Sequence, residues 1–164
     1  MDLSLFKKLQ DLNIHFTTYE HEPVFTVEQA RVLTQDIPGA SCKNLFLKDS
    51  KGNFYLIVAI FDTQIKLKNL SKYLKAPELR FASPELLKEY LGVEPGSVTP
   101  FGLLADHEHK IRVLLDERLF ENEKLGFHPL RNSATTVISP ENLKQFIEAC
   151  GNMYFVIDFG ILGV

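Results

Sequence analysis

Three short stretches of the sequence carry residues that could do chemistry together. They are ASCKNLFLK at residues 40–48, LGVEPGSVTPFG at residues 91–102 and FHPLRNSATT at residues 127–136. The first supplies the ammonium group of Lys43, the second a run of backbone amides, and the third the imidazole of His128. An ammonium and amides that meet at a carbonyl oxygen stabilise the negative charge that develops when an ester is attacked. The pattern is therefore compatible with chemistry at an acyl group, although the residue types alone also fit a rigid turn and a surface lysine.

Glycine and proline shape the segment from residue 91 to residue 102. Its three glycines permit positive φ, while its two prolines fix φ and lack an amide hydrogen. Within it, a GxxxP pattern leaves backbone N–H groups free to point at an anionic or carbonyl oxygen. The alternative interpretation is a rigid turn between two elements. The candidate site residues of this loop are Gly96, Ser97, Val98, Thr99 and Pro100.

Lys43 lies in a strand pattern with apolar neighbours, directly before Asn44. A lysine there either extends from a strand edge into solvent or is held in a cleft for a purpose. Because successive strand residues face opposite ways, Lys43 and Asn44 can share a site only if the strand is bulged or ends there. Cys42 has no histidine or acid placed by the sequence to activate it, so we predict a buried strand residue.

His128 ends a short predicted strand and is followed by proline. Its residue type alone fits either a hydrogen-bonded structural histidine or a functional one. Asn132, Thr135 and Thr136 then either support the same wall or are ordinary turn and strand residues. Residues 106–109, DHEH, could be mistaken for a metal cluster, but their polar neighbours and spacing favour a solvated loop. We therefore predict neither a metal nor any other cofactor.

The composition is that of a folded globular chain. A length of 164 residues, a hydrophobic content of 45% and 13 phenylalanines predict one domain spanning residues 1–164. No apolar run approaches the length of a membrane span, and the first ten residues have helical periodicity without a signal peptide's cleavage site. The two cysteines do not form the framework of a secreted disulfide-rich protein. These features predict a cytoplasmic location and no membrane partner.

The charge is distributed unevenly along the chain. The net charge of −3 argues against DNA as a partner and against a nucleic-acid binder with an all-basic surface. Residues 43–89 nevertheless hold nine basic and five acidic residues, a local excess of +4. Such a segment either docks a phosphate backbone or is an ordinary solvated helix surface. Charge alone leaves both interpretations open.

Hydrophobic periodicity, caps and turn residues predict the elements that must position these residues. Helices are expected at residues 4–12, 27–33, 66–74, 84–90 and 140–150, with a helical turn at 117–120. Strands are expected at residues 16–19, 40–48, 54–60, 111–115, 124–128, 135–138 and 154–159. Short strands among unevenly placed helices do not give the rhythm of a parallel βαβ sheet. We therefore predict an α+β fold with a curled, mixed and mainly antiparallel sheet.

The three stretches resemble the motifs of the YbaK/aminoacyl-tRNA synthetase-associated (prolyl-tRNA editing) domain family. CKNLFL, GVEPGSVTPFG and FHPLxNxxTTxI occur in the family's order and spacing, and the resemblance runs from about His21 to the C-terminus. It is closest to the branch of freestanding Ala-tRNA(Pro) deacylases of the ProXp-ala or PrdX type. The resemblance implies a small, distorted, barrel-like sheet surrounded by helices.

The resemblance also implies roles for individual residues. The family's motif lysine contacts the 3′-terminal adenosine and its aminoacyl ester, which makes Lys43 and the loop position Gly96 the candidate catalytic residues. Asn44 is then the polar neighbour of that lysine, and His128 lines and limits the amino-acid pocket, with Asn132 beside it. The chain departs from the family where it has Ala105-Asp106 and Gly151-Asn152, since the family often has Asn-Asp and Gly-His there.

The function that the resemblance implies is a trans-editing hydrolase that clears alanine from mischarged Ala-tRNA(Pro) and excludes proline by size. Water would be activated by backbone groups or by the ribose hydroxyl of the substrate, because no base accompanies the motifs. The implied partners are the 3′ acceptor end of tRNA(Pro) and prolyl-tRNA synthetase. One alternative is a deacylase for Cys-tRNA(Pro) or another small aminoacyl-tRNA. Another is a noncatalytic tRNA-end or synthetase-binding module in which Lys43 only contacts phosphate.

Overall fold

The computed structural model describes residues 2–162, apart from the side chains of residues 2, 27 and 31. Its helices are α1 (Asp2–Asp11), α2 (Val27–Thr34), α3 (Leu67–Leu74), α4 (Pro84–Leu91), α5 (Pro140–Cys150) and α6 (Phe159–Leu162), with the 3-10 helices η1 (Pro100–Ala105) and η2 (Glu117–Glu121). Its strands are β1 (Thr17–Glu20), β2 (Ala40–Lys48), β3 (Phe54–Ile60), β4 (Arg80–Phe81), β5 (Ile111–Asp116), β6 (Leu125–Phe127), β7 (Ala134–Ile138) and β8 (Tyr154–Ile157). None of the helices described is long and apolar enough to cross a membrane.

Local capping explains why three of the helices begin where the sequence predicts. The hydroxyls of Thr26, Ser83 and Ser139 each accept a hydrogen bond from the backbone amide three residues further on. Gly92 and Gly151 end α4 and α5 in the left-handed region, with φ of 67° and 82°. These short-range interactions confirm the predicted positions of α2, α4 and α5.

The hairpin of β2 and β3 has the predicted bounds at both strands. Its antiparallel register runs from Cys42 opposite Ile60 to Lys48 opposite Phe54 without interruption. The buried carboxylate of Asp49 closes the turn between the strands, where its Oδ1 accepts hydrogen bonds from two turn amides at 2.9 Å. The turn and the strand pattern therefore favour the same hairpin.

All eight strands form one mixed sheet, as expected for an α+β fold. The order is β1-β7-β6-β2-β3-β5-β8, and β4 pairs with β2 beside this path. Four pairings are antiparallel and three, β2 with β6, β3 with β5 and β5 with β8, are parallel. The sheet does not close into the barrel-like form that the resemblance implies, because β1 and β8 lie at its two ends.

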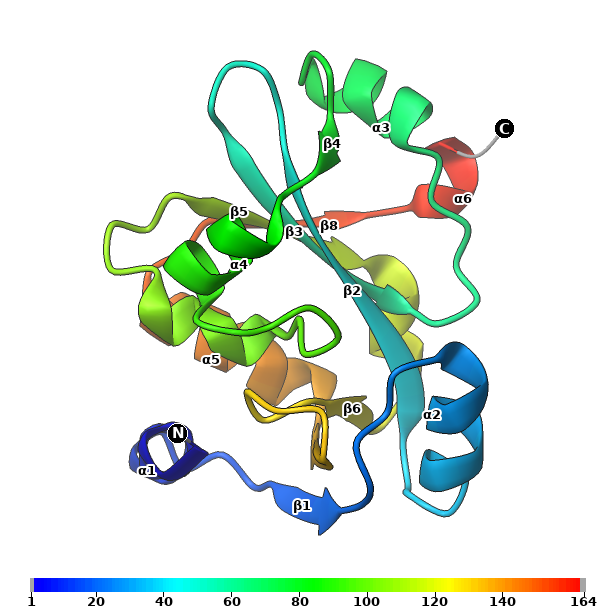
Figure 1. Ribbon diagram of the computed structural model, residues 1–164, viewed down its shortest axis with the longest axis vertical. Coiled ribbons are helices and arrows are strands. Elements are labelled where there is room, and N and C mark those ends of the chain that lie inside the picture. The colour runs from blue at the N-terminus through cyan, green and yellow to red at the C-terminus, as the bar shows by residue number, and fades with distance from the viewer. Residues whose placement is uncertain (1, 163–164) are drawn as a thin grey trace.

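Strand β3 is buried on both faces of the sheet, which explains its unbroken apolar sequence. Alternate residues of β3 belong to two separate hydrophobic clusters. One cluster joins the sheet to α1, α4, η1 and α5, and the other joins it to α3 and α6 at the opposite side (Figure 1). The two layers hold β2 and β3 in the middle of the fold.

Four elements, β8, α6, β4 and η1, differ from the sequence prediction. The last strand ends at Ile157, two residues earlier than predicted, and the chain continues into α6. The sequence did not predict β4 and η1, because both are short and follow no clear periodicity. Gly102 lies inside η1 and does not use positive φ. A side chain there would place its Cβ 2.8 Å from the carbonyl oxygen of Leu91, so this glycine allows close packing of η1 against α4.

Candidate functional site

A cavity of about 430 Å³ lies beside the first half of β2. Its lining comes from residues 24–26, from α2 and the turn after it, from residues 40–44 of β2, from residues 126–128, and from the separate residues Phe61, Gly96 and Thr135. Figure 1 shows α2 packed next to this end of β2, with β6 on the other side. The volume is in the range of small-molecule sites, and the cavity joins parts of all three stretches that the sequence singles out.

The structure brings four of the predicted site residues together at this cavity. They are Lys43, Asn44, Gly96 and His128. The other five predicted residues, Ser97, Val98, Thr99, Pro100 and Asn132, lie outside the lining. Their direct contact with a substrate stays a prediction, and the structure gives several of them other interactions.

Those interactions fix the shape of the GxxxP loop. The amide of Ser97 donates to the carbonyl of Glu94 at 3.0 Å, so it is not free in the way the sequence pattern suggests. Thr99 is fully buried, and its hydroxyl caps η1 by accepting from the amide of Phe101. Gly96 itself has φ of 91°, a region that favours glycine. The loop therefore presents Gly96 to the cavity and anchors the following residues in the core.

An interruption in the sheet explains how Lys43 and Asn44 both line one cavity. One edge of β2 pairs with β3 continuously from residue 42 to residue 48. The other edge pairs with β6 only at Ala40 and Ser41, and with β4 only at residues 47–48. No strand covers that edge between them within the described chain, and both residues line the cavity there. The expected bulge or strand end is not needed.

Lys43 is the one lysine, arginine, aspartate or glutamate among the described residues of the lining. Burial lowers the pKa of its ammonium below the ordinary value, and the negative charges of Asp116 and Asp62 act in the opposite direction. Lys43 forms no ion pair within the described part of the chain. Its charge is therefore available to a substrate.

Asn44 contributes an acceptor without a donor. Its Oδ1 is buried and has no hydrogen-bond partner among the described residues. Buried polar atoms of this kind are rare, because the loss of hydration is not compensated. The oxygen is also inaccessible to solvent, so a bound molecule reaches it only if the Asn44 side chain turns toward the cavity that it lines.

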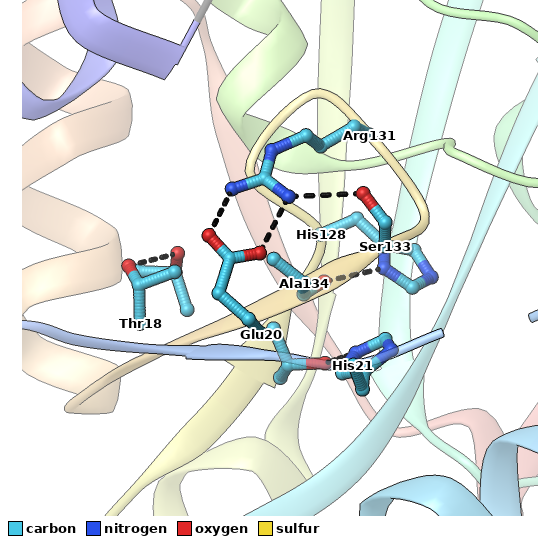
Figure 2. Close-up of polar contacts among 9 residues, drawn as sticks. Thr18, Glu20, His21, His128, Arg131, Ser133 and Ala134 are labelled. Carbon is cyan, nitrogen blue, oxygen red and sulfur yellow. Dashed lines mark hydrogen bonds and ion pairs between the residues drawn. The ribbon is translucent and has the colours of Figure 1, made fainter. Parts of the chain in front are cut away.

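The wall formed by His128 is held rigidly to β1. Arg131 in the β6–β7 loop forms a bidentate ion pair with Glu20, at 2.7 Å for both contacts, and also donates to Ser133 (Figure 2). The His128 Nδ1 lies 3.1 Å from the carbonyl oxygen of Ala134. Burial lowers the pKa of His128, so its ring is neutral at pH 7 and Nδ1 carries the proton.

Asn132 supports the same wall from outside the lining. Its Nδ2 donates to the carbonyl of Val24 at 2.9 Å, and the amide of Val24 donates back to the carbonyl of Asn132 at 3.2 Å. These two hydrogen bonds tie the β6–β7 loop to the segment that leads into α2. Of the two interpretations open for Asn132, the structure favours support of the wall.

His21 and Thr135 are residues of the wall whose contact the sequence does not reveal. The His21 Nε2 lies 2.9 Å from the Thr135 Oγ1 (His21 is labelled in Figure 2). The His21 Nδ1 lies 2.8 Å from the carbonyl oxygen of Glu22. The two side chains are 114 positions apart and meet because β1 pairs with β7. A sequence-based prediction of this contact would therefore have required knowledge that β1 pairs with β7.

Cys42 also lines the cavity, but its chemistry is that of a neutral thiol. Burial raises the pKa of Cys42 to about 12, and its Sγ contacts the carbonyl oxygen of Ala40 at 3.7 Å. Because the thiolate is the nucleophilic form, the side chain is inert near neutral pH. This agrees with the predicted role as a strand residue, although the side chain is half-buried rather than fully buried.

The two dipeptides that contain the departures from the family pattern meet away from the cavity, through Asn152 and the matching residue Asp106. Asp106 Oδ2 accepts hydrogen bonds from the Asn152 Nδ2 and the amide of Ile111, both at 2.9 Å, and Oδ1 accepts from the amide of Lys110. The sequence predicts a solvated loop at residues 106–109. Asp106 is only 3% exposed, so this prediction is wrong for Asp106. Its buried carboxylate organises the start of β5.

A family model described as "Aminoacyl-tRNA editing domain" matches residues 21–146. The matched range includes every residue of the cavity lining. It therefore includes the contributions of β2, the GxxxP loop and the β6–β7 region.

Full-length relatives carry names that concern prolyl-tRNA. The chain is 38% identical over 156 residues to "Prolyl-tRNA editing protein ProX" of Acetoanaerobium sticklandii, covering 94% of this chain and 95% of that protein. It is also 38% identical to "Prolyl-tRNA synthetase associated domain-containing protein 1" of Mus musculus, covering 94% of each. Among solved structures, a "putative trans-editing enzyme for prolyl tRNA synthetase" superposes with a TM-score of 0.72 at 22% identity, covering 96% of this chain and 94% of that one. The last similarity concerns the fold.

Proposed function

The chain belongs to the aminoacyl-tRNA editing domain family, and we propose that it is a trans-editing hydrolase that cleaves the ester of mischarged Ala-tRNA(Pro). The names of its relatives support the coarser part of this function, an aminoacyl-tRNA deacylase in prolyl-tRNA editing. Alanine as the amino acid removed is the finer part. The observation that carries the proposal is that Lys43, Gly96 and His128, from three distant stretches, line one cavity.

Lys43 is the residue to which we assign stabilisation of the transition state. Water adds to the ester carbonyl carbon, and the carbonyl oxygen takes up negative charge beside the Lys43 ammonium. The bond from the carbon to the ribose oxygen then breaks, the ribose oxygen receives a proton, and alanine and tRNA are released. The described lining contains no aspartate or glutamate that would pair with the ammonium and reduce its effect on the carbonyl.

Asn44 and Gly96 hold the substrate around that charge. We assign to Asn44 a hydrogen bond with a hydroxyl of the terminal ribose, for which its side chain turns the buried, unpartnered Oδ1 toward the cavity. Gly96 brings the backbone of its loop close to the cavity because no side chain intervenes. The 3′ acceptor end of tRNA(Pro) is thus the proposed occupant, with prolyl-tRNA synthetase as the enzyme whose errors are corrected.

Selection of alanine over proline is assigned to the wall at His128. The cavity as a whole has room for an aminoacyl ester and part of the terminal nucleoside, so its total volume does not select alanine. His128 is fixed by its contact with Ala134, in a loop that Arg131 anchors to β1. A rigid wall can exclude the larger proline ring while it admits a methyl group, and the correct product then escapes hydrolysis.

The test is a comparison of deacylation rates for Ala-, Cys-, Ser- and Pro-tRNA(Pro), with wild type, Lys43→Ala and the matched surface variant Lys51→Ala. We expect Ala-tRNA(Pro) to be hydrolysed fastest and Pro-tRNA(Pro) no faster than in buffer. Lys43→Ala should lose hydrolysis and keep tRNA binding, while Lys51→Ala, in the exposed β2–β3 turn, should behave as wild type.

Other outcomes would change different parts of the proposal. Fastest hydrolysis of Cys-tRNA(Pro) would replace alanine as the substrate and keep the deacylase. A wild-type protein that accelerates none of the four reactions is not this enzyme. Loss of tRNA binding alone in Lys43→Ala, with the reaction unaffected at saturating tRNA, would leave Lys43 as a phosphate contact.

A further inference from the structure

The cavity wall that contains His128 and Thr135 offers hydrogen-bond acceptors rather than donors. His21 and His128 each place Nδ1 next to a backbone carbonyl oxygen, at 2.8 Å and 3.1 Å. A carbonyl oxygen can only accept, so in each neutral ring Nδ1 carries the proton and Nε2 keeps a lone pair. Both imidazoles are therefore fixed in the same tautomer by the main chain.

The tautomer of His21 determines the direction of the Thr135 hydroxyl. The Nε2 of His21 lies 2.9 Å from the Thr135 Oγ1, and in this tautomer it accepts the hydroxyl proton. The methyl group of Thr135 faces Gly126, where a side chain would place its Cβ 2.9 Å from Cγ2. With its proton given to His21, the Thr135 oxygen can accept but not donate a further hydrogen bond, and Thr135 is one of the residues that line the cavity.

The proposed substrate has a group that needs such an acceptor. Besides its carbonyl and its methyl group, an alanyl ester carries an α-ammonium with three N–H donors. No carboxylate is present in the described lining to bind that ammonium, and Lys43 would repel it. The Thr135 oxygen is neutral, keeps a lone pair and lies on a different strand from Lys43. It is therefore suited to bind the α-ammonium.

We propose that Thr135 is the α-ammonium subsite of the editing cavity, and that His21 is a positioning residue that holds the Thr135 hydroxyl as an acceptor. His128 lines the same cavity, and its Nε2, which also keeps a lone pair, is the second neutral acceptor of the proposed subsite. Figure 2 shows His21 and His128 together with the ion pair of Glu20 and Arg131. This subsite rests on the proposed function.

The test compares two substrates that differ only at the group in question. Alanyl-tRNA(Pro) carries the α-ammonium, and propionyl-tRNA(Pro) is the same ester without it. The ratio of kcat/KM for the two esters is measured in wild type, Thr135→Val, Thr135→Ser and His21→Phe. Their different intrinsic reactivity cancels when the ratio for a variant is divided by the ratio for wild type.

Removal of the acceptor should affect the alanyl ester alone. In Thr135→Val we expect the ratio to fall by about tenfold or more, the scale of a hydrogen bond to a charged group, with hydrolysis of the propionyl ester kept. Thr135→Ser keeps the hydroxyl and should retain most of the wild-type ratio. Thr136→Val is the matched control, because the Thr136 hydroxyl bonds to Thr18 at 2.8 Å and is outside the lining.

The role of His21 is tested by its dependence on Thr135. His21→Phe should lower the ratio by a smaller factor than Thr135→Val, since the hydroxyl is then free to rotate but still present. The double variant should be no worse than Thr135→Val alone, because His21 acts through that hydroxyl. Additive losses would show that His21 has a separate role and would overturn its assignment.

The failures of the subsite and of the proposed function are distinguishable. If wild type hydrolyses alanyl-tRNA(Pro) and Thr135→Val slows both esters equally, the deacylase stands and the ammonium subsite is wrong. If wild type hydrolyses neither ester, the proposed function itself is wrong. Hydrolysis of the propionyl ester also reports that each variant is folded.

Discussion

The buried carboxylates of this fold and the polar groups of its cavity differ in how far their hydrogen-bonding capacity is used. Asp106 and Asp116 are 3% and 1% exposed, and each accepts three hydrogen bonds, two of them from backbone amides. In the cavity, the Oδ1 of Asn44 has no partner and Lys43 has no ion pair among the described residues. Both carboxylates therefore have several hydrogen-bond donors, whereas these two polar groups of the cavity lining have no partner in the described structure.

The difference distinguishes the two carboxylates from the proposed site, but an unpartnered atom alone does not mark function, because the buried Oδ1 of Asn152 beside Asp106 also has no partner among the described residues. A buried charge is tolerated when the protein itself satisfies it, and it then stabilises the turn that supplies the amides. A group left unsatisfied lowers stability unless a ligand completes it. Acidic residues are therefore used here to close turns, and the proposed chemistry is left to a lysine and neutral acceptors. Four measurements can break or sharpen this contrast.

Lys43→Ala should give the largest change in activity and little change in stability. We expect kcat to fall by at least about 100-fold, the usual cost of one group that stabilises an oxyanion. The free energy of unfolding should change by less than about 0.5 kcal/mol, because the ammonium has no partner in the described structure. Single-turnover deacylation and urea unfolding measure the two effects. A large loss of stability would instead show that Lys43, like the buried carboxylates, contributes to the fold.

Asp106→Ala should show the opposite profile. The substitution leaves the amides of Lys110 and Ile111 and the side chain of Asn152 without their acceptor. We expect the free energy of unfolding to fall by about 3 kcal/mol. Deacylation at 25 °C should stay within about twofold of wild type, because Asp106 does not line the cavity.

Glu108→Ala is the control for Asp106→Ala, since Glu108 is an exposed carboxylate of the same loop with only a surface ion pair. Its stability should match wild type to within about 0.5 kcal/mol. Equal effects of the two substitutions would remove the distinction between an engaged carboxylate and a surface one.

The stability of the fold should decline in acid partly through Asp49. Burial alone would raise the pKa of its carboxyl, but hydrogen bonds from Asn53, Tyr55 and Lys51 outweigh burial and lower the pKa below its ordinary value of 3.8. A lowered folded-state pKa contributes stability above the unfolded value, and this contribution is lost as the pH falls through the folded one. Urea unfolding at pH 6 and pH 3 measures the loss. Asp49→Asn should reduce the difference between the two pH values, and an unchanged difference would contradict the assignment.

Cys42→Ala should have the smallest effect of the four. The thiol lines the cavity, but its pKa of about 12 keeps it protonated at neutral pH. We expect deacylation to stay within about threefold of wild type, and alkylation of Cys42 by iodoacetamide at pH 8 to be slow. A loss comparable to that of Lys43→Ala would mean that the reaction proceeds through a thioester.

Much of the secondary structure could be predicted because its causes are local. These causes act over three to five residues, so a short stretch of sequence is enough to predict them. They are the helix caps at Ser83 and Ser139, the helix ends at Gly92 and Gly151, and the turn after Lys48. The short elements β4 and η1 were missed because each depends on packing against a distant strand or helix. The resemblance to a family, rather than periodicity, indicated that the three motif stretches share a site.

The sequence by itself determined the kinds of chemical group available: an ammonium on a strand, a shaped loop and an imidazole beside a proline. The tertiary structure alone decided that β2 lacks a neighbour between β6 and β4, so that Lys43 and Asn44 share an opening. It alone placed His21 against Thr135 and Asp106 against Asn152. The physical reason is that strand order and register depend on which apolar faces are buried together across the whole chain, and no short stretch contains that information.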